Sequence, residues 1–275
     1  MTILVTGARG TIARAVIAAL TASGQPLRIA SREPSAVPNA VVYDPSDPGP
    51  ALQDISQVFL YADPASAPAF VAAAEAAGVK QVVLLSSMAS HADHPGDPHA
   101  ETERIIGSGA YATTVLQPGT FMSNARFWAY QVRATGQIRL PYLDAEEAPI
   151  HEQDIADAAL RVLLDGPGNG HDGRAYALTG PESMTRRRQI QLITEVTGDP
   201  IHAIDLTPDQ ARTELAATMR NPAQLEPCCL TGPPASASPT RSSPPSNSSR
   251  GTRPAPSPPG SRTTALSSLD TRGLN

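Results

Sequence analysis

Cysteine, aromatic residues and long apolar runs are all scarce in this chain of 275 residues. The two cysteines, Cys228 and Cys229, are adjacent, which suits neither a structural disulfide nor a zinc site. Aromatic residues make up 4% of the chain, so a core drawn from its 40% hydrophobic residues must consist of Ala, Val, Leu and Ile. No apolar run approaches the roughly eighteen residues that a membrane span needs. The formal net charge of -5 argues against a nucleic-acid surface.

These absences predict a soluble, cytoplasmic protein that binds neither nucleic acid nor membrane. The N-terminal sequence MTILVTGARG has no basic stretch before an apolar segment, so we expect no signal peptide. The length allows one large domain or two small ones. The sequence leaves open whether the protein is a monomer or a homodimer.

Strand and helix patterns alternate through the first 118 residues. Short runs of β-branched and aliphatic residues predict strands, and apolar residues at helical spacing predict the helices between them. The expected strands are Ile3–Val5, Leu27–Ala30, Val41–Tyr43, Val58–Tyr61, Val82–Leu85 and Thr113–Leu116, and the expected helices are Thr11–Leu20, Ser66–Ala77 and His99–Ile106. Such alternation predicts an α/β fold with a doubly wound parallel sheet of the Rossmann type, covered on both faces.

Beyond Pro118 the pattern is looser and predicts a small cap region. We expect helices over Glu152–Leu164, from Thr185 to Thr197 and from Pro208 to about Ala217, with a short strand at Tyr176–Leu178. Residues 1–226 are therefore predicted to form an NAD(P)-binding Rossmann domain with cap elements from about residue 120. Residues 227–275 are rich in Pro and Ser and are predicted to be a disordered tail.

A glycine-rich turn lies directly between the first strand and the first helix. Its sequence, TGARGTIA from Thr6 to Ala13, places Gly7 at a tight turn and Gly10 where a pyrophosphate would approach the backbone. The following helix offers unpaired N–H groups and the positive end of its dipole to the phosphates. The strand and helix on either side make this a specific signal for a dinucleotide.

The end of the second strand indicates which dinucleotide is preferred. Binders of NAD tend to have an acidic residue here for the ribose 2′-hydroxyl, whereas this chain has Ser31 and Arg32, with Glu33 one position further on. A hydroxyl and a guanidinium suit a 2′-phosphate, and Arg9 in the glycine turn can reach the same group. We therefore expect NADP(H) rather than NAD(H). Asp44 either accepts a hydrogen bond from the adenine or caps a turn before Pro45.

Several blocks in this order resemble the NmrA-like, atypical short-chain dehydrogenase/reductase family, in particular its NAD(P)H-binding quinone- or azo-reductase-like members. The resemblance spans roughly residues 1–217. The blocks are TGARGTIA, GVKQVVLLSS at 78–87, TTVLQPGTFMSN at 113–124, PIHEQDIADAA at 149–159 and GRAYALTGPESMT at 173–185.

The resemblance implies a set of cofactor contacts. It implies that the glycine turn lines the phosphates and that Arg32 faces the adenosine ribose. It also implies that two later strand ends border the nicotinamide and its ribose. The residues are Gly7, Arg9, Gly10, Thr11 and Ile12 at the phosphates, Tyr61 and Ala62 along the ribose, and Ser86, Ser87, Pro118, Gly119, Thr120 and Phe121 at the nicotinamide.

Two departures from the family pattern bear on the chemistry. Typical short-chain dehydrogenases have a Tyr-x-x-x-Lys pair after the serine, but the corresponding segment here, His99 to Glu103, contains neither residue. The NmrA-like group commonly lacks this pair too. The family's Leu-Arg-Pro-Gly turn reads Leu-Gln-Pro-Gly, with Gln117 in place of the arginine. Quinones need little proton donation by the protein, so they remain suitable hydride acceptors. Ser87 and His99 are the candidate catalytic residues, and His99 would act as the proton donor.

Three weaker signals have competing interpretations. The loop that holds His91, Asp93, His94, Asp97 and His99 is either a metal site or, as we favour, a polar lid with no metal. The run Arg186–Arg188 is expected to be a solvated helix face rather than a nucleic-acid contact. Trp128 and Tyr130, near Phe121 and Phe127, either line a small-molecule pocket or pack in the cap.

The tail departs from the ending that the resemblance implies, a helix with a pattern like TGRPARTFAEWVADH. Codons compatible with Arg250 to Leu266, taken one base earlier, permit TGHPARTFAPWVADHRA. This match leads to the hypothesis that the sequence after about Glu226 is the product of a frameshift.

Two functions remain open at this point. The first is an NADP(H)-binding oxidoreductase that transfers a hydride to a quinone-like or azo-like small molecule. The second is a non-catalytic, redox-sensing regulatory protein of the NmrA type.

Overall fold

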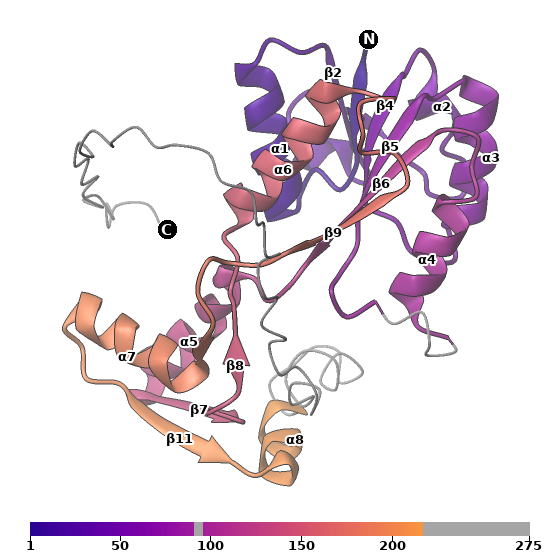
Figure 1. The fold of residues 1–275 in the computed structure, drawn as a ribbon. Helices are drawn as coiled ribbons and strands as arrows, with labels where there is room; N and C mark the ends of the chain where they lie inside the picture. Colours follow the sequence, from indigo (N-terminus) through magenta and orange to yellow (C-terminus); the bar gives the residue numbers. More distant parts are fainter. Residues whose placement is uncertain (91–95, 217–275) are drawn as a thin grey trace, which may run out of the picture. The chain divides into compact units, whose positions relative to one another are not determined.

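A seven-stranded sheet dominates the computed structural model, which describes residues 1–90 and 96–216 (Figure 1). The strand order is β3-β2-β1-β4-β5-β6-β9, and every neighbouring pair is parallel. This order extends the arrangement 3-2-1-4-5-6 that defines the Rossmann fold. The strands are β1 (Ile3–Val5), β2 (Leu27–Ser31), β3 (Ala40–Val42), β4 (Gln57–Leu60), β5 (Gln81–Leu85), β6 (Ala112–Pro118) and β9 (Arg174–Leu178).

Helices cover both faces of this sheet, as the continuous apolar strands predict. One face packs against α1 (Thr11–Ala22) and α6 (Glu152–Asp165), and the other against α2 (Gly49–Leu52), α3 (Ala67–Ala77) and α4 (Pro98–Ile106). Aliphatic side chains fill both interfaces, and Phe59 and Phe70 are the largest buried side chains. The predicted fold class is therefore confirmed.

The predicted buried strand around Val41 is wrong in one respect. Strand β3 forms, but Val41 and Val42 are 40% and 64% exposed. The physical reason is its position, because β3 is the outermost strand and pairs only with β2 in the sheet. An edge strand has less cover from the helices than a central one has.

A second group of elements follows β6. It has its own small core of Ile138, Leu140, Leu143 and Ile190, against which Trp128 and Val132 pack. The strands form a parallel pair, β7 (Gln137–Pro141) with β11 (His202–Leu206), and an antiparallel pair, β8 (Glu146–Glu147) with β10 (Met184–Thr185). The helices are α5 (Arg126–Thr135), α7 (Arg186–Thr197) and α8 (Pro208–Ala216), and the 3-10 turn η2 (Met122–Ala125) precedes α5. The other 3-10 turn, η1 (Pro34–Ala36), lies earlier in the chain, between β2 and β3.

The predicted helix ends in this region are confirmed. The Thr185 hydroxyl accepts a hydrogen bond from the Arg188 amide at 3.1 Å, and Gly198 ends α7 in a left-handed conformation. The interpretation of Arg186–Arg188 as a solvated face holds only in part. The Arg186 side chain is 13% exposed and its Nε donates to Glu147 at 2.6 Å, because it joins α7 to β8.

A pair of buried glutamines ties the sheet to α6. The Gln57 amide nitrogen donates to the Gln81 side chain at 2.6 Å and to the Leu163 carbonyl at 2.7 Å, and Gln81 donates to the Val162 carbonyl at 3.3 Å. The last carbonyls of a helix lack partners within the helix. The two glutamines therefore satisfy the C-terminal end of α6 inside the core.

Replacing Gln57 by leucine is expected to lower the free energy of unfolding by about 2–4 kcal/mol, because two buried acceptors lose their donor. Urea denaturation measures the loss, with Gln191→Leu on an exposed surface of α7 as the control. A loss below about 1 kcal/mol would show that water replaces the amide without cost.

The loop between α6 and β9 is closed by a polar chain. His171 contacts the Tyr176 hydroxyl at 2.8 Å through Nδ1 and the Asp165 carboxylate at 3.0 Å through Nε2. The hydrogen bond from His171, aided by that from Arg161, holds the pKa of Asp165 below its usual range. A carboxyl group with a lowered pKa stabilises the fold above its unfolded-state pKa, and this contribution is lost as the pH falls through the folded-state value.

Asp165→Asn is therefore expected to lower Tm modestly at pH 7, by roughly 1–2 °C given the exposure of the group. The difference from the wild type should shrink as the pH falls below about 4, where the unfolded-state carboxyl becomes protonated, and should disappear once the folded-state carboxyl, whose pKa is lower, is protonated too. Thermal melts across this range measure it, with Asp199→Asn as the control. A difference that does not change with pH would mean that the charge of Asp165 is irrelevant.

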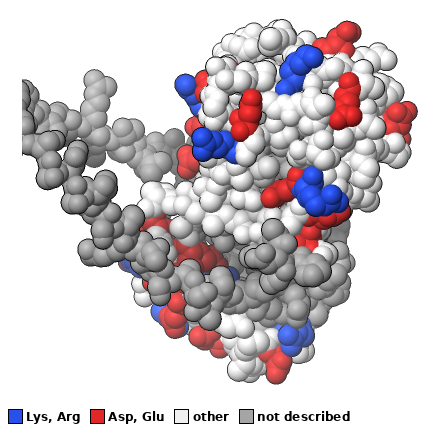
Figure 2. Space-filling model, turned by 45° about the vertical axis from the view of Figure 1, so that its right-hand side comes forward, with Lys and Arg blue, Asp and Glu red and all other residues white. Residues whose placement is uncertain are grey.

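On the face shown in Figure 2, basic and acidic side chains lie interspersed. Within the described ranges, no helix has the length and apolar character that crossing a membrane requires.

The predicted tail at 227–275, the frameshift hypothesis and the two cysteines all lie outside the described residues.

Candidate functional site

The turn between β1 and α1 has the geometry that its glycines predict. Gly7 has a φ of +66°, and a Cβ placed on it would lie 3.0 Å from the Tyr61 ring. Gly10 precedes α1, and its amide donates to the Gly7 carbonyl at 2.8 Å. A side chain at Gly7 would therefore be strained, and a Cβ on Gly10 would lie 3.2 Å from the Gly7 carbonyl oxygen. With no side chain at either position, the backbone of the turn is open to a ligand.

Helix α1 begins without a capping side chain. No side chain accepts a hydrogen bond at Gly10, and the first turn contains no acidic residue. Its first amides therefore remain available to an anion, at the positive end of the helix dipole. Thr11 is exposed at this end, whereas the Ile12 side chain is 2% exposed and packs in the core. Ile12 can contact a phosphate only through its backbone.

Thr6 is a site residue that the sequence did not single out. It is buried, its hydroxyl donates to the Phe59 carbonyl at 3.3 Å, and it accepts from the Tyr61 amide at 2.7 Å. This bridge holds the end of β4 beside the glycine turn. It places Tyr61, which is 44% exposed, against Gly7, and Ala62 follows it partly buried.

Three polar residues lie at the carboxyl end of β2. Ser31 is buried and accepts a hydrogen bond from the Glu33 amide at 3.1 Å. Arg9 reaches across from the glycine turn and forms an ion pair with Glu33, with both side chains more than half exposed. Arg32 is exposed, and its guanidinium has no hydrogen bond or ion pair among the residues that the structure describes.

Asp44 forms the turn that was one of its two interpretations. Its Oδ1 accepts from the Ser46 amide at 2.8 Å and from the Ser46 hydroxyl at 2.6 Å. The Ser46 hydroxyl above all, and then its amide, hold the pKa of Asp44 below the usual range. The hydrogen bond to an adenine stays a prediction for its other oxygen.

The ends of β5 and β6 are joined by backbone hydrogen bonds. The Ser86 amide donates to the Leu116 carbonyl at 2.8 Å, and the Met88 amide donates to the Pro118 carbonyl at 3.0 Å. A Cβ on Gly119 would lie 3.2 Å from the Met88 sulfur.

The turn that follows β6 is held by Ile150. The Ile150 amide donates to the Thr120 carbonyl at 2.9 Å, and Phe121 packs partly into the core. The predicted segment Pro118–Phe121 therefore stands directly beside the two serines, with the Phe121 ring committed in part to packing.

Glu103 is a second residue that sequence reasoning missed. It lies on α4 and accepts hydrogen bonds from the Ser86 hydroxyl and from the Gln117 amide nitrogen, the latter at 3.0 Å to each carboxylate oxygen. The sequence offered one signal, the presence of Gln117 where the family has an arginine. Glu103 lies 14 positions from Gln117, on a different element, and no local sequence pattern reveals such a contact.

The candidates in the loop after β5 are only partly within the described residues. His91, Asp93 and His94 lie outside them. Asp97 caps α4 by accepting from the Ala100 amide at 2.9 Å, and His99 is exposed in the first turn of that helix. No contact within the described residues joins His99 to Ser86 or Ser87.

The register of the sheet brings the other candidates together. Val5 pairs with Ile29 and with Phe59, and Leu60 pairs with Leu84, so neighbouring strands end at the same edge. In open α/β sheets, ligands bind outside the carboxyl ends of the strands, where the winding direction changes. Here that point lies between β1 and β4, because the chain continues from β1 to β2 on one side and from β4 to β5 on the other.

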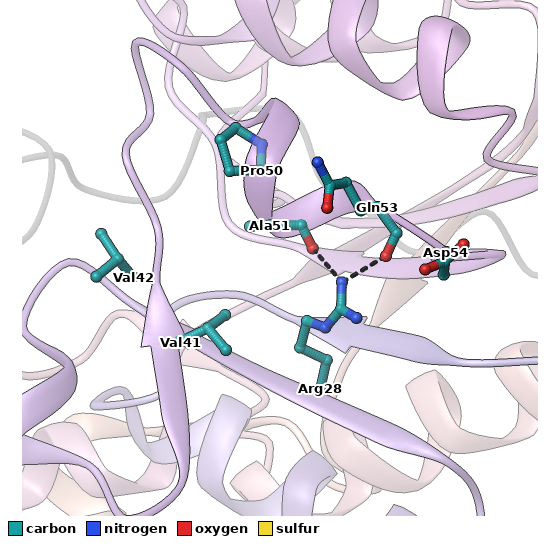
Figure 3. Close-up of a pocket in the computed structure, with 7 residues that line it drawn as sticks. All are labelled: Arg28, Val41, Val42, Pro50, Ala51, Gln53 and Asp54. Carbon is teal, nitrogen blue, oxygen red and sulfur yellow. Dashed lines mark hydrogen bonds between the residues drawn. The ribbon is translucent and has the colours of Figure 1, made fainter.

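A cavity of about 340 Å³ lies elsewhere, near the outer edge of the sheet (Figure 3). The Arg28 guanidinium extends into it and donates to the Ala51 carbonyl at 3.0 Å and to the Gln53 carbonyl at 2.5 Å. The lining residues are Arg28, Val41, Val42, Pro50, Ala51, Gln53 and Asp54. None of them belongs to the glycine turn or to the serine pair, so this cavity is separate from the candidate site.

The family of the chain follows from comparison with known sequences. A family model described as NAD(P)H-binding matches residues 7–166, which run from the first glycine of the turn to the end of α6. This chain belongs to the NAD(P)H-binding family. The family resemblance drawn from the sequence is thereby confirmed.

Two relatives that the chain matches are named as reductases. The chain is 36% identical over 231 residues to the (4-alkanoyl-5-oxo-2,5-dihydrofuran-3-yl)methyl phosphate reductase of Streptomyces griseus, which covers 78% of this chain and 80% of the relative. It is 29% identical to the NAD(P)H azoreductase of Xenophilus azovorans over 52% of this chain and 50% of that protein. The fold matches the Escherichia coli NADPH-dependent quinone oxidoreductase in complex with NADPH, with a TM-score of 0.69 and 23% identity over 81% of this chain and 84% of the other.

Proposed function

We propose that this protein is an NADP(H)-dependent reductase that transfers a hydride to a conjugated, electron-poor small molecule such as a quinone or an azo compound. The observation that carries the proposal is the turn at Gly7 and Gly10, which presents bare backbone and leads into an uncapped helix. A pyrophosphate fits this turn because backbone amides and a helix dipole can neutralise it. Bound NADPH would supply the hydride.

Contacts with the cofactor are proposed along the whole carboxyl edge. The backbone of Gly7 to Ile12 would hold the phosphates, and Tyr61 and Ala62 would border the ribose. The ends of β5 and β6 would border the nicotinamide, from Ser86 and Ser87 on one strand to Pro118, Gly119, Thr120 and Phe121 on the other.

The preference for NADP(H) over NAD(H) is proposed from the end of β2. Arg32 has an exposed guanidinium with no partner in the described part of the chain, and Arg9 is ion-paired with Glu33, the next residue after Arg32. A 2′-phosphate offers such guanidinium groups a charged acceptor, whereas a ribose hydroxyl does not. Ser31 is buried next to them and would shape the pocket floor rather than donate freely.

The class of acceptor is inferred from the scarcity of acid–base side chains at the site. The segment His99–Glu103 contains no tyrosine or lysine, and His99 is exposed. A quinone takes up a hydride and becomes a stabilised hydroquinone anion, which solvent can protonate. The acceptor therefore needs orientation more than a strong proton donor.

A second acceptor class is favoured by one relative. The reductase of Streptomyces griseus is named for an alkanoyl-substituted oxo-dihydrofuran phosphate, which is also a conjugated, electron-poor carbonyl compound. The regulatory alternative is less favoured, because the relatives above are enzymes that reduce small molecules.

The test is a panel assay of NADPH oxidation by the purified chain with a benzoquinone, an azo dye and an acyl-substituted furanone. Turnover of at least one acceptor, with a rate that saturates in NADPH, is expected. Tight binding of NADPH without oxidation by any acceptor would favour the regulatory role instead.

A further inference from the structure

Two adjacent serines follow β5, and their hydroxyl groups are committed in different ways. Both Ser86 and Ser87 are half-buried. The Ser86 hydroxyl donates to the Glu103 carboxylate. The Ser87 hydroxyl oxygen accepts from the Ala89 amide at 3.0 Å, and its proton has no acceptor among the described residues. The hydroxyl proton of Ser86 is therefore engaged in a hydrogen bond, whereas that of Ser87 is available to a ligand as far as the described residues are concerned.

The Glu103 carboxylate is fixed from a second side. The Gln117 amide nitrogen, on β6, donates to both of its oxygens at 3.0 Å. An ionised carboxylate can only accept hydrogen bonds. Ser86 is therefore the donor in its bond to Glu103, and only its lone pairs remain for a hydrogen bond with a ligand.

This arrangement decides which ligand groups Ser86 can bind. A carbonyl oxygen or a developing oxyanion needs a donor, and Ser86 can provide one only by giving up a bond to a charged group. Bonds of that kind contribute more than neutral ones. An N–H or O–H group of the cofactor, such as a carboxamide NH₂ or a ribose hydroxyl, matches the lone pairs of Ser86 without that loss.

We propose that Glu103 is a positioning residue that converts Ser86 into a hydrogen-bond acceptor dedicated to the cofactor, while Ser87 is left to donate to the hydride acceptor. The role of Ser87 rests on the proposed function. The roles of Glu103 and Ser86 rest only on NADPH binding. It also assigns Gln117 a role, which is to hold the carboxylate that orients Ser86.

The test is a double-mutant cycle on NADPH affinity. Ser86→Ala is expected to raise the Kd for NADPH about 10-fold, because an N–H or O–H group of the cofactor loses its acceptor. Glu103→Gln is expected to raise the Kd about 5-fold in the wild type and to have no further effect when Ser86 is already alanine. Ser87→Ala is expected to lower kcat about 10-fold with an unchanged Kd.

Glu101→Gln is the matched control, because Glu101 lies on the same helix and forms an exposed ion pair with Arg104. Additive effects of Ser86→Ala and Glu103→Gln on Kd would overturn the positioning role, as would a loss of kcat in Ser86→Ala at constant Kd. Circular dichroism and Tm separate these outcomes from misfolding. If the wild type binds NADPH but reduces no acceptor, the proposed function fails, whereas the affinity cycle still decides the roles of Ser86 and Glu103.

Discussion

Gly7→Ala is expected to weaken NADPH binding by roughly 30- to 100-fold, equivalent to about 2–2.7 kcal/mol. Gly7 has a φ of +66°, and the added methyl group would lie 3.0 Å from the Tyr61 ring. The turn must shift to relieve this contact, and the amides that would face the pyrophosphate shift with it. Calorimetric titration with NADPH measures the effect.

Gly24→Ala is the matched control for this substitution. Gly24 has a φ of +69°, but no atom lies within 4 Å of the position of its Cβ. Both variants therefore carry the same kind of backbone strain, and only one of them disturbs the turn. If the two variants bind NADPH equally well, the glycine turn does not hold the phosphates.

Arg32→Ala is expected to raise the Kd for NADPH about 10- to 100-fold and to leave the Kd for NADH within about twofold. A hydrogen bond to a charged group contributes about 1.5–3 kcal/mol, and only NADPH carries the 2′-phosphate. The ratio of the two dissociation constants is the quantity to measure, because a general loss of stability would affect both cofactors.

Arg161→Ala provides the control for the loss of one positive charge. Arg161 is exposed on α6, near the end that contacts the start of β4 and β5, and so lies away from the carboxyl edge. An equal loss of affinity for NADH and NADPH in Arg32→Ala would contradict the proposed 2′-phosphate contact and would point to a structural role.

The parallel core and the glycine turn could be predicted because their signals are local. Strands β1 to β6 and helices α1, α3 and α4 each carry their own pattern, whereas the four-residue α2 and the turn η1 are too short to show one. The turn at Gly7 needs only residues that are neighbours in sequence. The edge position of β3 could not be predicted, since the exposure of Val42 depends on what packs beside it. The pattern of Val41 and Val42 looks the same in a central strand and in an outer one.

The parts of the site that were missed depend on distant partners. Glu103 and Gln117 meet across two elements, and Thr6 meets Phe59 across 53 positions. Nothing in the sequence near any of them indicates these contacts. The same holds for β7, which is only five residues long and whose partner β11 lies more than sixty residues further along the chain.

The most direct test of the account is an anaerobic single-turnover experiment in which the protein, saturated with NADPH, is mixed with a benzoquinone. We expect NADPH absorbance to be lost at a rate that increases with protein concentration, together with formation of the hydroquinone in equal amount. NADPH that stays bound and is consumed no faster than in free solution would contradict the account, and would assign the chain a binding role without catalysis.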